Sequence, residues 1–303
     1  MMTLSKIRGL SRGDRLYFAV TYLLIFFFVL LTLFPIYFIL IASFSSPNDV
    51  MLGKVLLLPS SPTFKAYEMV FKNANIWTAY GNTVVYTLVG TALSLTATLT
   101  AAFVFSRRGL YGSRACMLAI LFTMYFSGGL IPTYFNIRNL GMLNTIWALV
   151  LPGMISGYNL IIARTFMQSS IPDALDEAAK LDGCTPIRYF LSVVIPLSTP
   201  IIGVLCLYSV VGHWNSYYNA LIYLTERKRY PLQLILREIL VQGSMNTENI
   251  TDISAMEEAF EFLNLAESLK YALVIVSSLP MLILYPFLQK FFVKGVMIGS
   301  VKG

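Results

Sequence analysis

The sequence predicts an all-α integral membrane protein with six transmembrane helices, on the basis of its composition and the spacing of its apolar stretches. Hydrophobic residues make up 57% of the chain and charged residues 12%. The hydrophobic residues gather into six stretches, close to or above the roughly 20 residues that a helix needs to cross a bilayer. None of these stretches contains Asp or Glu, which cost about 2.5–3.5 kcal/mol at the centre of a membrane helix.

The predicted spans belong to a single membrane domain that covers residues 1–303. A short segment, 1–15, precedes the first span, a core of about 75–292 holds the other five, and 293–303 form a tail. The first span is too long for a secretory signal and lacks a small-residue cleavage site, so we expect it to be retained. The six spans are residues 16–44, 79–105, 116–135, 145–167, 197–224 and 271–292.

Basic residues in the short connections orient the chain, because Lys and Arg concentrate in the cytoplasmic loops of membrane proteins. The segment before the first span, the connection after the second span and the tail are basic, so both termini are expected in the cytoplasm of a bacterial cell. These residues are Lys6, Arg8, Arg12, Arg15, Arg107, Arg108, Arg114, Lys290, Lys294 and Lys302. The connection 170–196 is then also cytoplasmic, and the long connection 225–270 lies outside.

The net charge of +7 reflects this loop bias. A nucleic-acid partner is not expected, because no basic face is clustered in the sequence. The three cysteines, Cys116, Cys184 and Cys206, are isolated from one another and predict neither a disulfide framework nor a metal site.

Motifs for independent catalysis are missing. The chain has no GxxxxGK[ST] loop, no HExxH and a single histidine, His213, so we expect no catalytic residue and no cofactor bound by this chain. Transport against a gradient would then need a partner or a coupled ion. Ion-coupled carriers commonly place carboxylates inside the membrane, and their absence here favours a partner.

The connection 170–196 is a polar, charge-rich island between two apolar stretches, and its residues predict two short helices. Ser170 suits the N-cap of the first helix, with Pro172 in its first turn and Asp173 at the reciprocal capping position. Gly183 suits a left-handed C-cap. A second helix then starts at Thr185 and Pro186 and runs into a break at Pro196. Apolar Ile171, Leu175, Ala178 and Ala179 recur on one side of the first helix, opposite Asp173, Asp176, Glu177 and Lys180.

The small side chains of Ala178 and Ala179 allow another protein surface to approach the backbone closely. A cytoplasmic helix joined to two spans can convey a displacement into the membrane, so we interpret the island as a coupling element. The alternative is an amphipathic helix that lies on the lipid headgroups. Its acidic face suits an anionic leaflet poorly.

These residues resemble the EAA signature of the permeases of ABC importers, which reads EAA, three residues, G, nine residues and I-x-L-P. The chain matches this spacing with Glu177, Ala178, Ala179, Gly183, Val193, Ile195 and Pro196. In that family the EAA helix sits in a cleft of a cytoplasmic ATPase subunit. The resemblance therefore implies a coupling-helix loop between spans four and five and ATPase-docking roles for Asp173, Glu177, Ala178, Ala179, Asp182, Gly183 and Pro196.

The resemblance extends over nearly the whole chain and is greatest to the MalG-like permeases of carbohydrate importers. It rests on Asn82 and Thr83 at the start of the second span and on Ile131, Pro132, Leu140, Gly141, Asn144 and Thr145 between spans three and four. The ending GVMIGSVKG resembles the family tail, which implies that Gly295, Gly299, Lys302 and Gly303 point toward the ATPase. The connection 225–270 is the part that matches least.

The resemblance also implies partners: a second six-helix permease, two ATPase subunits that use ATP and Mg, and an extracytoplasmic solute-binding lipoprotein. The function expected on this basis is one half of an import pathway for a sugar or oligosaccharide. An ion-coupled secondary carrier without an ATPase remains the alternative, followed by a membrane-embedded enzyme.

A cluster of aromatic rings and amides in the fifth span could contact a sugar. The candidates are His213, Trp214, Asn215, Tyr218 and Asn219. Aromatic rings stack on sugar faces and amides bond to hydroxyl groups. The alternative is an interfacial aromatic belt, with Asn215 closing a helix contact.

Two further patterns concern the second and third spans. Small and hydroxyl residues form a stripe on the second span, which we interpret as helix packing, with a pore lining as the alternative. The hydroxyl members are Thr83, Thr87, Thr91, Ser94 and Thr98. In the third span Gly128, Gly129 and Pro132 predict a break or kink near the outer end, which could serve gating or a simple loop entry.

Overall fold

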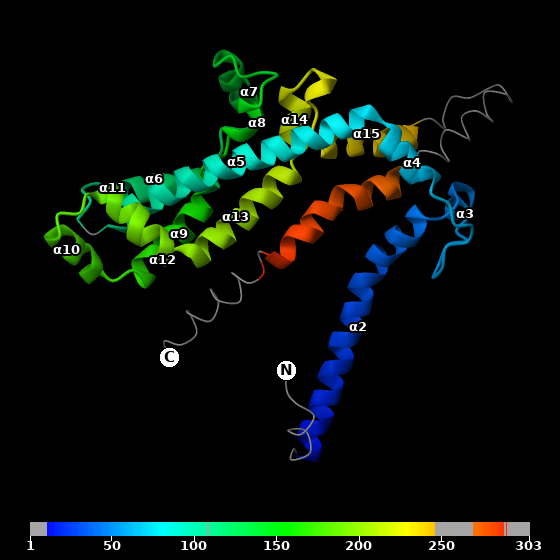
Figure 1. Ribbon diagram of the computed structural model, residues 1–303, viewed down its shortest axis with the longest axis horizontal. Helices are drawn as coiled ribbons and strands as arrows, with labels where there is room; N and C mark the ends of the chain where they lie inside the picture. Colours follow the sequence, from blue (N-terminus) through cyan, green and yellow to red (C-terminus); the bar gives the residue numbers. More distant parts are fainter. Residues whose placement is uncertain (1–10, 108, 246–268, 288, 290–303) are drawn as a thin grey trace. The chain divides into compact units, whose positions relative to one another are not determined.

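The computed structural model describes residues 11–107, 109–245, 269–287 and 289, and these residues form helices joined by turns, with no strand among them (Figure 1). The chain divides into two compact units. One consists of Met1–Lys72 and Ile239–Val276, and the other of Asn73–Glu238 and Ser277–Gly303.

The first unit contains α2 (Arg12–Ser43), α3 (Pro47–Met51) and α4 (Lys65–Lys72). The Ser11 hydroxyl caps α2 by accepting a hydrogen bond from the amide of Asp14 at 3.2 Å. Most apolar side chains of α2 are exposed, as expected of a helix whose solvent is hydrocarbon. At its end, Phe44 stacks on Tyr67 with ring centroids 5.0 Å apart, so the following connection folds back onto the helix.

The second unit is built on α5 (Ala74–Ser106), a helix of 33 residues, against which α13 (Thr199–Trp214) packs (Figure 1). The other helices up to the coupling loop are α6 (Ser113–Tyr125), α7 (Leu130–Asn139), α8 (Trp147–Val150), α9 (Gly157–Ser170) and α10 (Asp173–Leu181). Those that follow are α11 (Pro186–Tyr189), the π-helix η1 (Phe190–Val194), α12 (Ile195–Leu197), α14 (Tyr218–Tyr223) and the 3-10 helix η2 (Arg227–Arg229). The helix α15 (Leu232–Met245) begins in the second unit, and its residues from Ile239 onward belong to the first.

The main core of the second unit lies where α5, α9, η1 and α13 meet. Its buried members are Leu99, Ala102, Leu160, Ala163, Met167, Tyr189, Val194, Ile201 and Leu205. A second cluster joins α8, α14 and α15 through Leu149, Val150, Ala220, Leu224 and Leu234. The core thus connects segments far apart in the sequence around α5.

Three helices among the described residues are long and apolar enough to cross a membrane alone: Gly13–Ser43, Ala74–Ser106 and Leu269–Phe287. They correspond to the predicted spans 16–44, 79–105 and 271–292, of which residues 288 and 290–292 lie outside the described residues. Two bent pairs, Ser113–Tyr125 with Leu130–Asn139 and Pro186–Leu197 with Thr199–Trp214, raise the number to five if each pair is one span. A sixth span is consistent with this arrangement but does not meet the same test.

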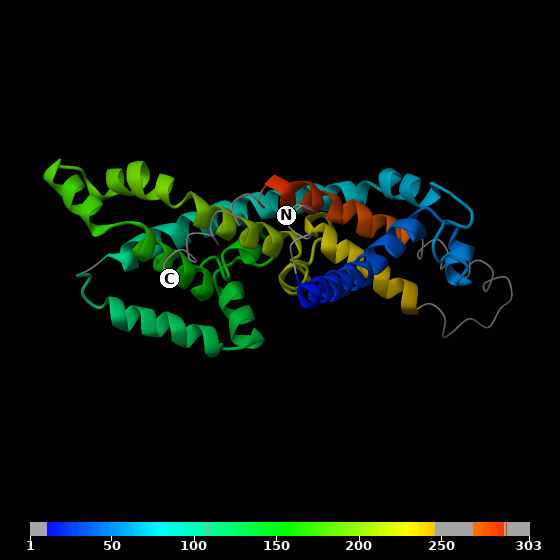
Figure 2. The ribbon, with the colours of Figure 1, turned by 90° about the horizontal axis from the view of Figure 1, so that it is seen from below.

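The third predicted span, 116–135, is interrupted near its end, as its glycines predict. α6 ends at Tyr125 and α7 begins at Leu130, with a bend of 115° between them (Figure 2). Gly129 has φ 84°, a left-handed conformation that glycine adopts without the steric cost of a side chain. The expected break at Gly128 and Gly129 is confirmed, whereas Pro132 lies in the first turn of α7, where a proline is tolerated.

The fourth and fifth predicted spans, 145–167 and 197–224, are wrong as continuous helices. In the fourth, residues 151–156 are irregular between α8 and α9, and Gly153 there has φ 77°. In the fifth, α13 ends at Trp214 and α14 begins only at Tyr218. Asn215, Ser216 and Tyr217 occupy this gap, and Asn and Ser are residue types whose side chains can compete for backbone hydrogen bonds.

Candidate functional site

The coupling loop begins two residues later than the sequence suggested. Ser170 is the last residue of α9, so its prediction as an N-cap is wrong, and Pro172 stands at the N-cap of α10 with extended backbone. The helical pattern of α9 continues through Ser170, and Pro172 restricts Ile171 to a non-helical conformation. The two helices are therefore separated by a sharp, short turn.

The end of α10 matches the prediction. Gly183 has φ 69°, its amide donates to the carbonyl of Lys180 at 3.1 Å, and the amide of Cys184 donates to that of Ala179 at 2.9 Å. This pair of bonds is a Schellman motif, which requires a left-handed residue at the glycine position. The Thr185 hydroxyl then caps α11, and Pro186 occupies its first turn. The break after this segment falls at Ser198, two residues beyond Pro196.

The surface of α10 is unusually open, because none of its side chains is buried. Leu181 is 90% exposed and nearby Ile187 is 73% exposed. Ala179 is half-buried and packs against the main core, whereas the other predicted docking residues are exposed. These are Asp173, Glu177, Ala178, Asp182, Gly183 and Pro196. The arrangement presents a short helix with apolar and acidic groups to a partner.

A polar cavity of about 230 Å³ is lined by α9 and α13, and the main core lies between this cavity and the coupling loop. Its wall includes Pro152 and Gly153 from the irregular segment 151–156 and Ser216 from the gap after α13. Hydroxyl, amide and imidazole groups face it from Ser94, Ser156, Asn159, Tyr208, Ser209, His213, Ser216 and Asn219. Non-helical backbone at membrane depth is tolerated where it lines a water-filled cavity.

The five predicted pathway residues do not share one site. His213 and Asn219 line the polar cavity. Trp214 is buried and its indole nitrogen donates to the carbonyl of Ser277 at 3.0 Å, and Asn215 faces a separate, mostly apolar cavity with Trp214. Tyr218 is 54% exposed. Sequence reasoning missed Asn159, Ser209 and the segment 151–156, because only the tertiary fold brings them to the cavity.

The hydroxyl stripe of α5 is buried along its length, which supports its interpretation as a packing surface. Gly90 allows α13 to approach, since a β-carbon there would lie 2.6 Å from the imidazole of His213. The hydroxyls of Thr87 and Thr91 have no hydrogen-bond partner among the described residues. Ser94 is the stripe member that lines the polar cavity.

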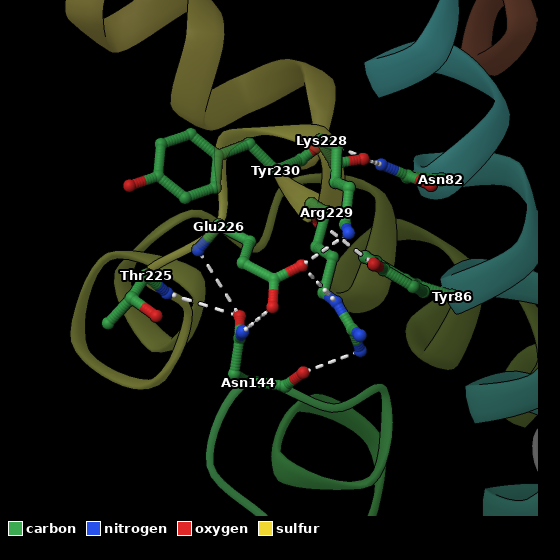
Figure 3. Close-up of polar contacts among 8 residues, drawn as sticks. All are labelled: Asn82, Tyr86, Asn144, Thr225, Glu226, Lys228, Arg229 and Tyr230. Carbon is green, nitrogen blue, oxygen red and sulfur yellow. Dashed lines mark hydrogen bonds and ion pairs between the residues drawn. The ribbon is translucent and has the colours of Figure 1, made fainter.

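A hydrogen-bonded junction holds the turn 225–230 (Figure 3). The side chain of Asn144, a residue with φ 57°, donates to the Glu226 carboxylate at 2.6 Å and accepts from the amides of Thr225 and Glu226 at 3.3 Å. Arg229 bonds to the carbonyl of Asn144 at 2.6 Å and to the Glu226 carboxylate at 3.1 Å. Lys228 pairs with the same carboxylate at 2.9 Å. Asparagine tolerates the left-handed conformation that this geometry needs.

The turn is expected to loosen on acidification below about pH 4.5. Hydrogen bonds from Lys228 and Arg229 lower the pKa of Glu226 from its ordinary value of 4.5. Because the folded pKa is the lower one, this stabilisation is complete above the unfolded pKa and is lost as the pH falls through the folded pKa. Hydrogen exchange of the Thr225 and Glu226 amides, corrected for intrinsic rates, should accelerate in that range.

Glu226→Gln is the matched control, since it keeps the shape of the side chain and cannot ionise. Its amides should exchange faster near neutral pH and show no additional acid step. An acid step of equal size in both proteins would contradict the role of this carboxylate.

The predicted tail residues Gly295, Gly299, Lys302 and Gly303 lie outside the described residues.

Known proteins resemble the chain over most of its length. A permease protein of the polygalacturonan/rhamnogalacturonan transport system of Bacillus subtilis, YtcP, is 36% identical over 290 residues, covering 96% of this chain and 99% of its own. Protein LplC of the same organism is 37% identical over 273 residues, covering 90% of each chain. The crystal structure of a bacterial ABC transporter that imports the acidic polysaccharide alginate matches with a TM-score of 0.83 and 31% identity, covering 93% of this chain and 99% of that one.

The family described as binding-protein-dependent transport system inner membrane component matches residues 74–298. Members are transmembrane subunits and not enzymes, and ATP hydrolysis resides in a partner subunit. This explains why the chain lacks an ATP-binding motif. On the extent of these matches, the chain belongs to the family of inner-membrane permease components of binding-protein-dependent ABC transporters.

Proposed function

We propose that the chain forms one half of the transmembrane pathway through which an ATP-driven importer takes up a sugar or oligosaccharide. The observation that carries the proposal is a combination within one compact unit: an exposed helix with EAA spacing, α10, and a neutral polar cavity at two helix breaks. The first suits coupling to an ATPase, and the second suits passage of a polyhydroxylated solute.

The chemistry of the cavity supports a saccharide. Serine hydroxyls and the amides of Asn159 and Asn219 can donate to and accept from sugar hydroxyls, and the ring of Tyr208 offers a face for stacking. None of the lining residues is an Asp, Glu, Lys or Arg. The names of two similar systems also refer to polysaccharides, polygalacturonan/rhamnogalacturonan and alginate. In this proposal His213 and Asn219, which line the cavity, contact the solute, and Trp214, Asn215 and Tyr218 are their neighbours in sequence.

The partners follow from the proposal. A second six-helix permease would complete the pathway, two ATPase subunits would bind ATP and Mg, and a solute-binding lipoprotein would deliver the cargo outside. The chain would lie in the bacterial plasma membrane with both termini cytoplasmic. ATP binding would close the ATPase pair, displace α10 through Asp173, Glu177, Ala178, Ala179, Asp182, Gly183 and Pro196, and turn the permease halves outward.

Receptor-stimulated ATP hydrolysis tests the proposal. The complete complex in lipid should hydrolyse ATP about fivefold faster or more when its receptor carries the matching saccharide, because binding at one site is coupled to turnover at another. The same receptor without solute serves as the control.

Failure of every saccharide to stimulate hydrolysis would contradict the cargo and leave family membership unaffected. Uptake by this chain without ATPase subunits, driven by an ion gradient in proteoliposomes, would contradict the proposed energy source.

A further inference from the structure

The C-terminal end of α5 holds the coupling helix through one arginine. Nη1 of Arg107 lies 2.9 Å from Oδ1 of Asp176 on α10. The guanidinium carbon stands 4.3 Å from the centroid of the Phe103 ring and 4.7 Å from that of Tyr189. The two rings therefore fix the plane of the guanidinium while its edge binds the carboxylate.

This ion pair is better shielded than the other contact of Asp176. The side chains of Arg107 and Asp176 are 27% and 24% exposed, whereas Lys180, whose Nζ lies 2.9 Å from Oδ2 of Asp176, is 71% exposed. Solvent screens an exposed pair strongly and a partly buried pair less. Of the two partners of Asp176, Arg107 is the better shielded from solvent, and it is the one that joins α10 to α5.

Packing alone holds α10 weakly. None of its side chains is buried, and two cavities flank the arginine. One, of about 290 Å³, is bordered by Phe103, Arg107 and Asp173, and the other, of about 200 Å³, by Arg107, Asp176 and Tyr189. A helix bordered by open space can move, and the ion pair between Asp176 and Arg107 would make the end of α5 move with α10.

The end of α5 is held a second time, by the helix that leads into α10. Nε of Arg164 on α9 donates to the carbonyl of Phe105 at 2.8 Å, and Nε2 of Gln168 donates to that of Ser106 at 3.4 Å. A cation at these carbonyls also complements the negative end of the helix dipole. The last turn of α5 is therefore joined to the chain both before and within the coupling loop.

The N-terminal half of α5 is joined to the turn 225–230. Nδ2 of the Asn82 side chain donates to the backbone carbonyls of Lys228 and Tyr230 at 2.8 and 3.1 Å, and the Tyr86 hydroxyl donates to the carbonyl of Arg229 at 2.8 Å. The Thr83 hydroxyl accepts from the amide of Leu232 at 2.8 Å. Arg107 follows Asn82 by 25 residues and Tyr86 by 21, so at 1.5 Å per residue α5 separates these contacts from Arg107 by about 32–38 Å without a break.

We propose that Arg107 is a positioning residue that couples α10 to α5, so that a displacement of the coupling helix is passed along α5 to the turn 225–230. The inference rests on the proposed docking of the ATPase at α10. It does not depend on the identity of the cargo.

Arg107→Met tests the proposal in the complete complex. A reporter cysteine replaces Gly81, an exposed residue of α5 whose added β-carbon meets no atom within 4 Å, in a chain whose three native cysteines are substituted. ATP with vanadate should change the rate at which an impermeant maleimide labels this cysteine by about fivefold or more in the reference protein. Arg107→Met should remove that change while the ATPase subunits still co-purify.

Rescue separates positioning from a loss of folding. The double variant Arg107→Asp with Asp176→Arg should restore part of the ATP-dependent change because it re-forms the ion pair, and Arg107→Lys should also restore part because it keeps the charge without a stacking plane. Arg114→Met, which removes an exposed arginine of α6 in the same connection, is the control and should behave as the reference.

An equal response of the reference and Arg107→Met, including no response in either, would contradict the proposal, as would failure of the charge-reversed pair to restore the change. Because the labelling experiment needs no solute, a wrong cargo would appear only in the hydrolysis experiment above. Loss of the ATPase subunits from the reference complex would instead contradict the docking proposal.

Discussion

Glu177→Lys should abolish solute uptake and release the ATPase subunits from the complex. Glu177 is exposed on α10 and makes no hydrogen bond or ion pair with the described residues, so its reversal should change the stability of the chain itself by less than about 0.5 kcal/mol. Breaking a charged contact at an interface costs about 2–5 kcal/mol, or roughly 30- to 5000-fold in affinity. Co-purification of tagged ATPase and uptake in proteoliposomes measure the two effects.

Glu68→Lys is the matched control for this reversal. Glu68 is also exposed, its carboxylate lies 3.7 Å from Nζ of Lys72, and it belongs to α4 and not to the coupling loop. Its reversal should leave both measurements unchanged. Normal ATPase association and uptake in Glu177→Lys would refute docking at this residue.

Gly90→Leu should separate α5 from α13 and inactivate transport. The β-carbon alone would lie 2.6 Å from the His213 imidazole, so the ring must move or the helices must part. Overpacking of this kind costs about 1–3 kcal/mol, and a displaced ring would enter the polar cavity that His213 lines. Thermal unfolding and uptake of the purified complex report the change.

Gly81→Leu on the same helix provides the comparison, because a β-carbon at Gly81 meets no atom within 4 Å. Its stability and uptake should match those of the unaltered chain. His213→Ala should recover much of the stability lost in Gly90→Leu. Equal losses in the Gly81 and Gly90 variants would show that the close approach has no special role.

Local signals predicted local structure well. The glycine at 183 and the Thr185–Pro186 pair predicted the end of α10 and the start of α11, because capping depends on residues within one turn. The N-terminus of α10 was misplaced because the helical pattern of α9 continues to Ser170. A cap residue alone does not exclude the continuation of a preceding helix.

The breaks within the spans, and which residues come together at each site, could not be predicted from the sequence because they depend on tertiary structure. Apolar composition does not reveal that the backbone is irregular at 151–156 or interrupted at Asn215 and Ser216. The contact between Arg107 and Asp176 joins residues 69 positions apart, and the sequence pattern around each residue does not identify the other as its partner. A signal was nevertheless present: an arginine one turn after Phe103, at the end of a long apolar helix, facing an acidic coupling loop.

The π-helix η1 determines how the coupling loop is joined to the membrane core. In an α-helix, five residues turn by about 500°, which would place Tyr189 and Val194 roughly 140° apart. Both are nevertheless buried in the same cluster, because the wider turn of η1 absorbs the excess rotation. A change of one residue in the length of this segment would therefore act as a twist: everything after it, including the bend at Ser198 and the cavity wall of α13, would rotate relative to the docking helix.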